Sequence, residues 1–137
     1  MFRKVFDLKT DEKIEIIDIT PEIQLIVEQS HYKNGIVNIY SKHSTSGLVI
    51  NENESGLLKD FKSTLETLIP FTGNYNHNCI DNNADAHIKS FLIGSSQTIP
   101  LYQGKLDVGT WQSVFFVEFD GPRTRKITVT VIGTNDY

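Results

Sequence analysis

The stretch "SVFFVEFDGPRTRKITVTVIG", residues 113–133, decides the fold class more than any other part of the sequence. It holds two runs of β-branched and aromatic residues, 113–119 and 126–132, with "DGPRTR" between them. Such runs are typical of β-strands, and Gly and Pro between them favour a tight turn. The pattern therefore predicts two strands that pair with each other as a hairpin.

Further strand-like runs flank this stretch, together with three helical segments. Strands are expected at 2–10, 13–19, 36–40, 46–51, 97–102 and 105–109. Residues 20–35 and 55–70 each carry apolar side chains at helical spacing, and residues 85–94 predict a third, short helix that ends at Gly94. Strands outnumber helices and do not alternate with them, so we expect an α+β fold with two main helices and one short helix.

Length and charge narrow the function classes. A chain of 137 residues is the size of one domain, which we expect to span 1–137. The net charge is −4 and no run of Lys or Arg occurs, which excludes a nucleic-acid partner that binds by bulk charge. No leader-like segment or apolar run of about 18 residues is present, and Cys79 is the single cysteine. We expect a cytoplasmic protein without a membrane partner.

Three histidines lie in polar, loop-like surroundings and form the first candidate site. They are His43, His77 and His87, and Asp81 and Asp85 lie close to the last two in sequence. Imidazole and carboxylate groups together can hold Zn²⁺ with one position open for water or substrate. The spacing matches no local zinc motif, so the alternative is that each histidine only bonds loop backbone.

Charged and hydroxyl side chains form the second candidate. Arg123 and Arg125 follow Glu118 across a tight turn, and two guanidinium groups on one side would clamp a phosphate. A surface ion-pair cluster is the alternative. Residues 42–47, "KHSTSG", place three hydroxyl groups in a turn where they can donate to phosphate oxygens. Trp111 lies two residues after Gly109, in "GTWQ", and is either a core residue or a ligand contact.

Several segments taken together resemble the YjbQ family. They are "HSTSGLVINENE" (43–54), "DNNADAHIKSFLIGSS" (81–96), "IPLYQGKLDVGTWQ" (99–112) and "EFDGPRTRKITVTVIG" (118–133). The resemblance covers about residues 5 to 134. It implies a mostly antiparallel, β-sandwich-like core and assembly as a homotrimer. It also implies thiamine-phosphate synthase activity, in which a thiazole phosphate displaces pyrophosphate from hydroxymethylpyrimidine diphosphate.

The resemblance and the candidate residues together define an expected site. Its catalytic residues would be His43, His77, His87, Asp85, Glu118 and Arg123. Its substrate-binding residues would be Lys42, Ser44, Thr45, Ser46, Trp111 and Arg125, and its metal ligands His43, His77, His87 and Asp81. Mg²⁺ would serve the reaction, with Zn²⁺ as the ion for the histidine cluster, and the partners would be small phosphorylated substrates. The alternatives are a metal-dependent hydrolase of a small phosphorylated or acyl substrate, and a non-catalytic trimer that binds an anion.

Overall fold

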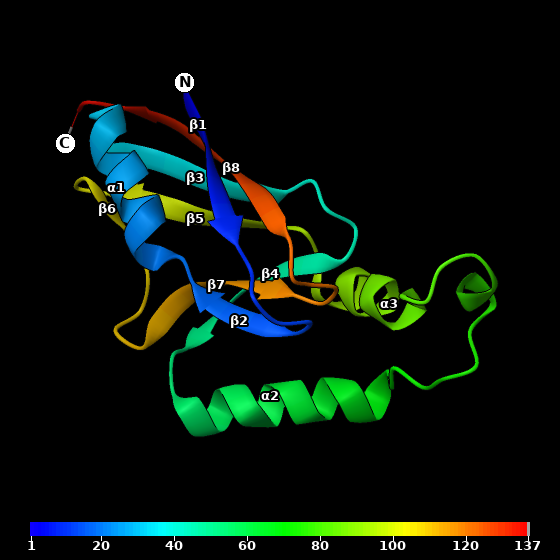
Figure 1. The fold of residues 1–137 in the computed structure, drawn as a ribbon. Coiled ribbons are helices and arrows are strands. Elements are labelled where there is room, and N and C mark those ends of the chain that lie inside the picture. Colours follow the sequence, from blue (N-terminus) through cyan, green and yellow to red (C-terminus); the bar gives the residue numbers. More distant parts are fainter. Residues whose placement is uncertain (137) are drawn as a thin grey trace.

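The computed structural model describes residues 1–136, which form two β-sheets and three α-helices (Figure 1). The strands are β1 (Phe2–Lys9), β2 (Glu15–Asp18), β3 (Asn34–Ser41), β4 (Ser46–Glu52), β5 (Ser96–Tyr102), β6 (Lys105–Leu106), β7 (Gln112–Glu118) and β8 (Thr124–Thr134). The helices are α1 (Thr20–Ser30), α2 (Ser55–Leu68), α3 (Ala84–Ile93) and the short 3₁₀ helix η1 (Asn76–Cys79). The predicted α+β fold with two main helices and one short helix is confirmed.

The two sheets are antiparallel and face each other across the main core. The larger has the strand order β1-β8-β3-β5-β6, and the smaller has the order β2-β7-β4. Figure 1 shows the large sheet above, the small sheet below it, and α2 as a further layer beneath the small sheet. Apolar residues from both sheets and from α1 form one continuous cluster between the layers, so the expected sandwich-like core is present.

The predicted hairpin at 113–132 is wrong, although both strands exist. β7 pairs with β2 and β4, whereas β8 pairs with β1 and β3, so the two strands belong to different sheets. The chain between them passes from one layer to the other at residues 119–123. Gly121 is required there, because a Cβ atom would come within 2.2 Å of the backbone oxygen of Glu12. The turn therefore forms a corner of the sandwich, with the predicted turn residues in place.

β7 contributes to both faces of the small sheet. Val114 and Phe116 enter the core between the sheets, whereas Val117 and the following Phe119 enter a second cluster on the opposite face. That second cluster includes Leu65 of α2 and residues of α3. Since side chains alternate along a strand, one run of apolar residues can supply two cores. The small sheet is thus covered on both sides.

The helices follow the predicted segments, with differences at their ends. α1 begins at Thr20 with Pro21 in its first turn. It ends at Ser30 rather than near the predicted Gly35, because the next residue, His31, adopts a left-handed conformation (φ 61°). The apolar face of α2 is turned to the small sheet as expected, since Leu65 is buried and Phe61 packs on the same cluster, but Leu68 at the end of the helix is exposed. No helix in the part of the chain that the structure describes is long and apolar enough to cross a membrane.

α3 packs closely on β4, and this contact positions the candidate site. The Leu48 amide of β4 donates to the Gly94 carbonyl at 3.1 Å, and the Ser90 hydroxyl of α3 donates to the Ser46 carbonyl at 2.6 Å. Gly47 permits the approach, since a Cβ atom there would meet the Ile93 side chain at 2.6 Å. The turn that contains His43 and Ser44 is therefore held beside the helix that carries His87.

Candidate functional site

The imidazole rings of His77, on η1, and His87, on α3, form a pair at the surface of the protein. Their ring centroids are 4.9 Å apart and their planes make an angle of 76°, an edge-to-face arrangement. Both line a surface hollow of about 490 Å³, together with Tyr75 and Phe91. Two imidazoles that share an open hollow can exchange protons with a ligand in it. This is the part of the predicted site that the fold brings together.

A chain of hydrogen bonds fixes the orientation of His77. Its Nε2 lies 3.1 Å from Asn83 Oδ1, Asn83 Nδ2 donates to Asp120 Oδ2 at 3.0 Å, and Arg123 Nη2 contacts the same Asp120 oxygen at 2.9 Å. Burial would raise the pKa of Asp120, but the hydrogen bonds from Asn83 and Arg123 outweigh it and lower that pKa. Asp120 is therefore an ionised acceptor.

This chain also determines which nitrogen of His77 carries the proton. Because an ionised carboxylate can only accept, the amide nitrogen of Asn83 faces Asp120 and its oxygen faces His77. Nε2 of His77 must then be the donor. In neutral His77 the lone pair is on Nδ1, which leaves that atom as a base or a ligand.

A second, smaller hollow adjoins His87 on the side of the β3–β4 turn. It measures about 300 Å³ and is lined by Ser44, His87, Ser90 and Ser95, together with Gly94 and Phe91. Ser44 is exposed, whereas the Ser90 hydroxyl already donates to the Ser46 carbonyl. Two of the predicted site residues, Ser44 of the 42–47 turn and His87, thus line the same hollow.

His43 lies in the same turn but is engaged by the neighbouring strand. Its Nε2 accepts a hydrogen bond from the Lys126 amide of β8 at 2.9 Å. Burial and, next, the positive charge of Arg125 lower the pKa of His43. A neutral His43 with an occupied Nε2 carries its proton on Nδ1. It therefore has no free lone pair for a metal ion in this arrangement.

Glu118 and Arg125 form a buried ion pair under the site. Arg125 Nε donates to Glu118 Oε1 at 2.8 Å, and its Nη2 contacts both Glu118 Oε2 and the Thr45 hydroxyl. Burial would raise the pKa of Glu118, but the bonds from Arg125, the Asp120 amide and the Thr10 hydroxyl hold it below its usual value. Both side chains are enclosed, so neither reaches a ligand.

The two arginines consequently do not form one clamp. Arg125 belongs to β8 and points into the sandwich, whereas Arg123 precedes the strand and is 51% exposed. Arg123 binds Asp120 through its Nε and Nη2 atoms. Of these two arginines, only Arg123 lies on the surface, and it belongs to the series of hydrogen bonds that orients His77.

Asp85 is also enclosed, in an ion-pair network between helices. Its Oδ2 accepts from Lys89 Nζ at 3.2 Å and from Lys13 Nζ at 3.0 Å, and Lys89 also binds Glu66 of α2 at 2.9 Å. Asp85 and Lys89 are almost completely inaccessible. The network joins α2, α3 and the loop before β2, and it fixes the helix that carries His87.

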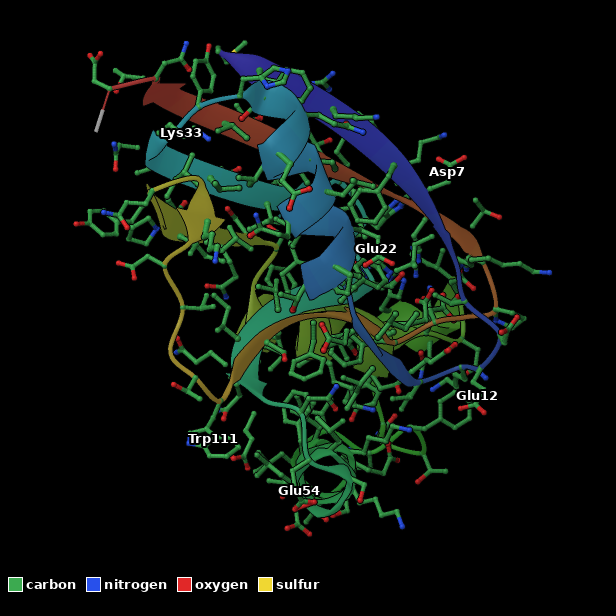
Figure 2. All side chains as sticks on the ribbon, turned by 90° about the vertical axis from the view of Figure 1, so that its left-hand side faces the viewer. Asp7, Glu12, Glu22, Lys33, Glu54 and Trp111 are labelled. Atoms are coloured by element: carbon green, nitrogen blue, oxygen red, sulfur yellow. The ribbon has the colours of Figure 1, made fainter. Side chains whose placement is uncertain are left out.

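The remaining predicted residues fall into two groups. Thr45 and Ser46 are buried, and their hydroxyls bond Arg125 and Ser41. Lys42 and Asp81 are exposed, and the Asp81 amide donates to the His77 carbonyl at 3.0 Å. Trp111 is 73% exposed on the loop between β6 and β7, which faces the viewer in Figure 2 and lies at the opposite end from α3 in Figure 1.

The expected metal centre does not assemble from this set within one chain. Among residues 1–136, no three His, Cys, Asp or Glu side chains converge to hold a single ion. His77 and His87 supply two imidazoles, one fewer than the three protein ligands usual in catalytic zinc sites.

Sequence reasoning missed Asn83 and Lys89. Asn83 precedes α3, where an asparagine side chain ordinarily caps the helix, but here no such cap bond forms. The amide instead connects His77 to Asp120. A sequence signal for Lys89 existed, since it lies four residues after Asp85 on a helix, the spacing of an intrahelical ion pair.

The fold and site define a single-domain α+β sandwich with an open imidazole pair at one end. The family described as UPF0047 protein, YjbQ-like, matches residues 4–134, and the chain belongs to it. A UPF0047 protein of Methanothermobacter thermautotrophicus is 50% identical over 97% of this chain and 93% of its own. The UPF0047 protein YugU of Bacillus subtilis is 35% identical over 95% and 98%.

Solved structures of similar proteins share the fold. A protein of unknown function from Sulfolobus solfataricus superposes with a TM-score of 0.94 at 40% identity, covering 96% of each chain. An uncharacterized conserved protein from Clostridium acetobutylicum gives a TM-score of 0.91 at 39% identity, covering 94% of this chain and 99% of its own.

These comparisons confirm the resemblance to the YjbQ family and correct the activity drawn from it. The relatives carry the UPF0047 designation without an activity, and the solved structures are described as uncharacterized or of unknown function. The expected thiamine-phosphate synthase activity is therefore wrong as an inference from family membership.

Proposed function

We propose that the protein is an enzyme that hydrolyses small phosphate esters by acid–base catalysis at the His77–His87 pair. The observation that carries the proposal is the hydrogen-bond chain from Arg123 through Asp120 and Asn83 to His77. A ring held by a second group and an acidic third partner is the usual arrangement of an oriented catalytic base. Other bonds also hold η1 in place, since the Tyr75 hydroxyl donates to the Pro70 carbonyl and the Asn78 side chain accepts the Ala84 amide.

The substrate phosphate would occupy the hollow beside His87. Ser44 and Ser95 offer hydroxyl donors there, and the side-chain lining contains no carboxylate that would repel an anion. The adjoining hollow, with Tyr75 and Phe91, would take the apolar or ring part of the ester. Arg123 and Lys42, both exposed, add positive charge near this end of the molecule.

In the proposed step His77 is the base and His87 the acid. Nδ1 of His77 takes a proton from water as the water oxygen bonds to phosphorus. The bond between phosphorus and the leaving oxygen breaks, and that oxygen takes a proton from the His87 ring. The proton on Nε2 of His77 stays with Asn83, which stabilises the imidazolium through the ionised Asp120.

We propose separately that the site can bind a divalent cation, and we assign the cation no step in the hydrolysis. A Zn²⁺ ion would find two imidazoles here, with His43 engaged by Lys126. Mg²⁺ prefers carboxylate and phosphate oxygens. Asp81, exposed and joined by its amide to the His77 carbonyl, is the carboxylate that an ion carried by the substrate would use.

We further propose that copies of the chain associate over an apolar face of α3, as a homotrimer. Ile88, Phe91 and Leu92 lie on one side of the helix, and Phe91 is 87% exposed. A neighbouring chain over Phe91 would cover part of both hollows and limit the entry of water. Sedimentation velocity checks this proposal, with Phe91→Asp expected to give monomers.

Steady-state hydrolysis of p-nitrophenyl phosphate, with phosphate release from a panel of natural monoesters, tests the activity. His77→Gln and His87→Gln should each lower kcat by about 100-fold or more, because a positioned acid or base contributes about 10²–10⁴-fold. The wild-type pH profile should require one unprotonated and one protonated group.

His31→Asn is the matched control. His31 lies outside the site, at the end of α1, with a positive φ that asparagine tolerates. It should retain wild-type rates. Equal rates from the wild type, His77→Gln and His87→Gln on every ester would contradict the proposed function.

A further inference from the structure

A second groove, which is mainly apolar, lies between α2 and the small sheet and shares no residue with the hollows at the imidazole pair. It measures about 380 Å³ and is bounded by Ile16, Val49 and Phe115 of the small sheet and by Leu57, Leu58 and Phe61 of α2. Figure 1 shows α2 as a separate layer under β2, β7 and β4. The groove thus lies between two layers of the fold.

The two halves of α2 pack differently against the sheet. In the C-terminal half, Leu65 is buried in a cluster with Val117 and Phe119. In the N-terminal half, Leu57 and Leu58 face the groove and are only partly covered. The first turn is nevertheless fixed, since Glu54 accepts the amides of Gly56 and Leu57. The groove is therefore bounded by an anchored helix.

Polar groups occur on one side of this groove, at the end of β4 and on β5. They are Asn51, Glu52 and Gln97. The Gln97 amide nitrogen donates to the Leu48 carbonyl at 2.8 Å, which leaves its oxygen as an acceptor. Within residues 1–136 no side chain donates to the half-buried Glu52 carboxylate. Two acceptors at the rim of an apolar groove favour a ligand that donates hydrogen bonds and carries positive charge.

Volume limits the size of such a ligand. A buried apolar cavity of about 150 Å³ holds benzene, so this groove has room for one ring and a short chain. We propose that the groove binds a small primary amine with an apolar ring or branched chain, its ammonium at Glu52 and Gln97. The net charge of −4 agrees with a cationic ligand. This site is independent of the imidazole pair and of the proposed hydrolysis.

Methyl and amide NMR with 2-phenylethylamine as the probe tests the proposal. The amine should shift the signals of Val49, Leu57 and Leu58. Glu52→Gln should weaken its binding by about fivefold or more, the equivalent of roughly 1 kcal/mol for an ion pair. Binding of the uncharged 2-phenylethanol should change by less than about twofold, because Glu52→Gln keeps the shape of the groove.

Two tryptophan variants of α2 separate groove binding from general surface binding. Leu57→Trp places an indole in the groove and should abolish binding of both probes, whereas Leu68→Trp, on the exposed end of the helix, should leave binding unchanged. Equal binding in the two variants would overturn the proposal, as would 3-phenylpropionate binding as tightly as the amine. Dissociation of an oligomer by Leu57→Trp alone would instead show that a second copy covers the groove.

Discussion

The buried pair Glu118–Arg125 and the open pair His77–His87 are both candidate site residues in the sequence, but the fold uses them differently. Glu118 and Arg125 satisfy each other and are sealed between the sheets. His77 and His87 face a hollow. The two are connected, because Glu118 accepts the amide of Asp120, which orients His77 through Asn83. The sealed pair supports the site, and the open pair can perform its chemistry.

The largest loss of stability should follow when the buried pair Glu118–Arg125 is broken. Arg125→Met leaves the Glu118 carboxylate buried without its main partner, which should lower the free energy of unfolding by about 3–5 kcal/mol. Urea titration monitored by circular dichroism measures the change. Arg123→Met, which removes an exposed ion pair, is the control and should cost less than about 1 kcal/mol. Similar losses for both variants would show that Glu118–Arg125 is not the structural pair.

The second buried network should give a smaller loss, because Asp85 keeps one partner. Lys89→Met removes the contacts with Asp85 and Glu66 but leaves Lys13 on Asp85, so we expect a loss of about 2–3 kcal/mol. Lys126→Met is the control, since its partner Asp7 lies on the exposed edge of the large sheet in Figure 2. Thermal unfolding of the two variants should differ clearly, and equal melting temperatures would contradict this prediction.

The open pair should show the reverse behaviour, with a functional effect and little loss of stability. Asn83→Ala removes the acceptor of His77 Nε2 and a donor to Asp120, so both tautomers of His77 become available. We expect kcat for ester hydrolysis to fall about 10-fold or more, with a loss of stability near 1 kcal/mol. A fall in stability with unchanged kcat would mean that Asn83 serves only the fold.

The smallest predicted effect is a pH dependence of stability that comes from His43. Its pKa is lowered from the usual value of 6.5 by burial and by Arg125, so the unfolded chain binds the proton more readily. The contribution is complete above pH 6.5 and is lost as the pH falls through the folded-state pKa. His43→Gln should flatten the stability curve in that window, as measured by urea titrations at several pH values. If the free energy of unfolding of His43→Gln depended on pH as steeply as that of the wild type, a group other than His43 would cause the dependence.

Local patterns predicted the elements of this fold well but not which strands pair. The turn residues at 120–124 are those of a hairpin, and a corner between two sheets needs the same residues. The apolar run of β7 was a clue, because all residues from Val114 to Glu118 are buried, as in a central strand covered on both faces. A hairpin strand with one face in water would alternate.

The candidate site was predicted in part, because sequence cannot tell an enclosed polar group from an open one. Thr45 and Ser44 are adjacent hydroxyl residues, yet one is buried against Arg125 and the other is exposed. Both residues lie in the turn before β4 begins at Ser46, so no strand pattern in the sequence distinguishes them. The partners of His77 come from residues 83 and 120, a separation that local motifs do not reach.

Long-range ¹H–¹⁵N NMR of the imidazole rings, recorded during titration with inorganic phosphate, tests the central claim most directly. We predict that neutral His77 carries its proton on Nε2, and that phosphate perturbs the rings of His77 and His87 but not those of His31 and His43. A proton on Nδ1 of neutral His77, or equal perturbation of all four histidines, would contradict the account of an oriented, open imidazole pair.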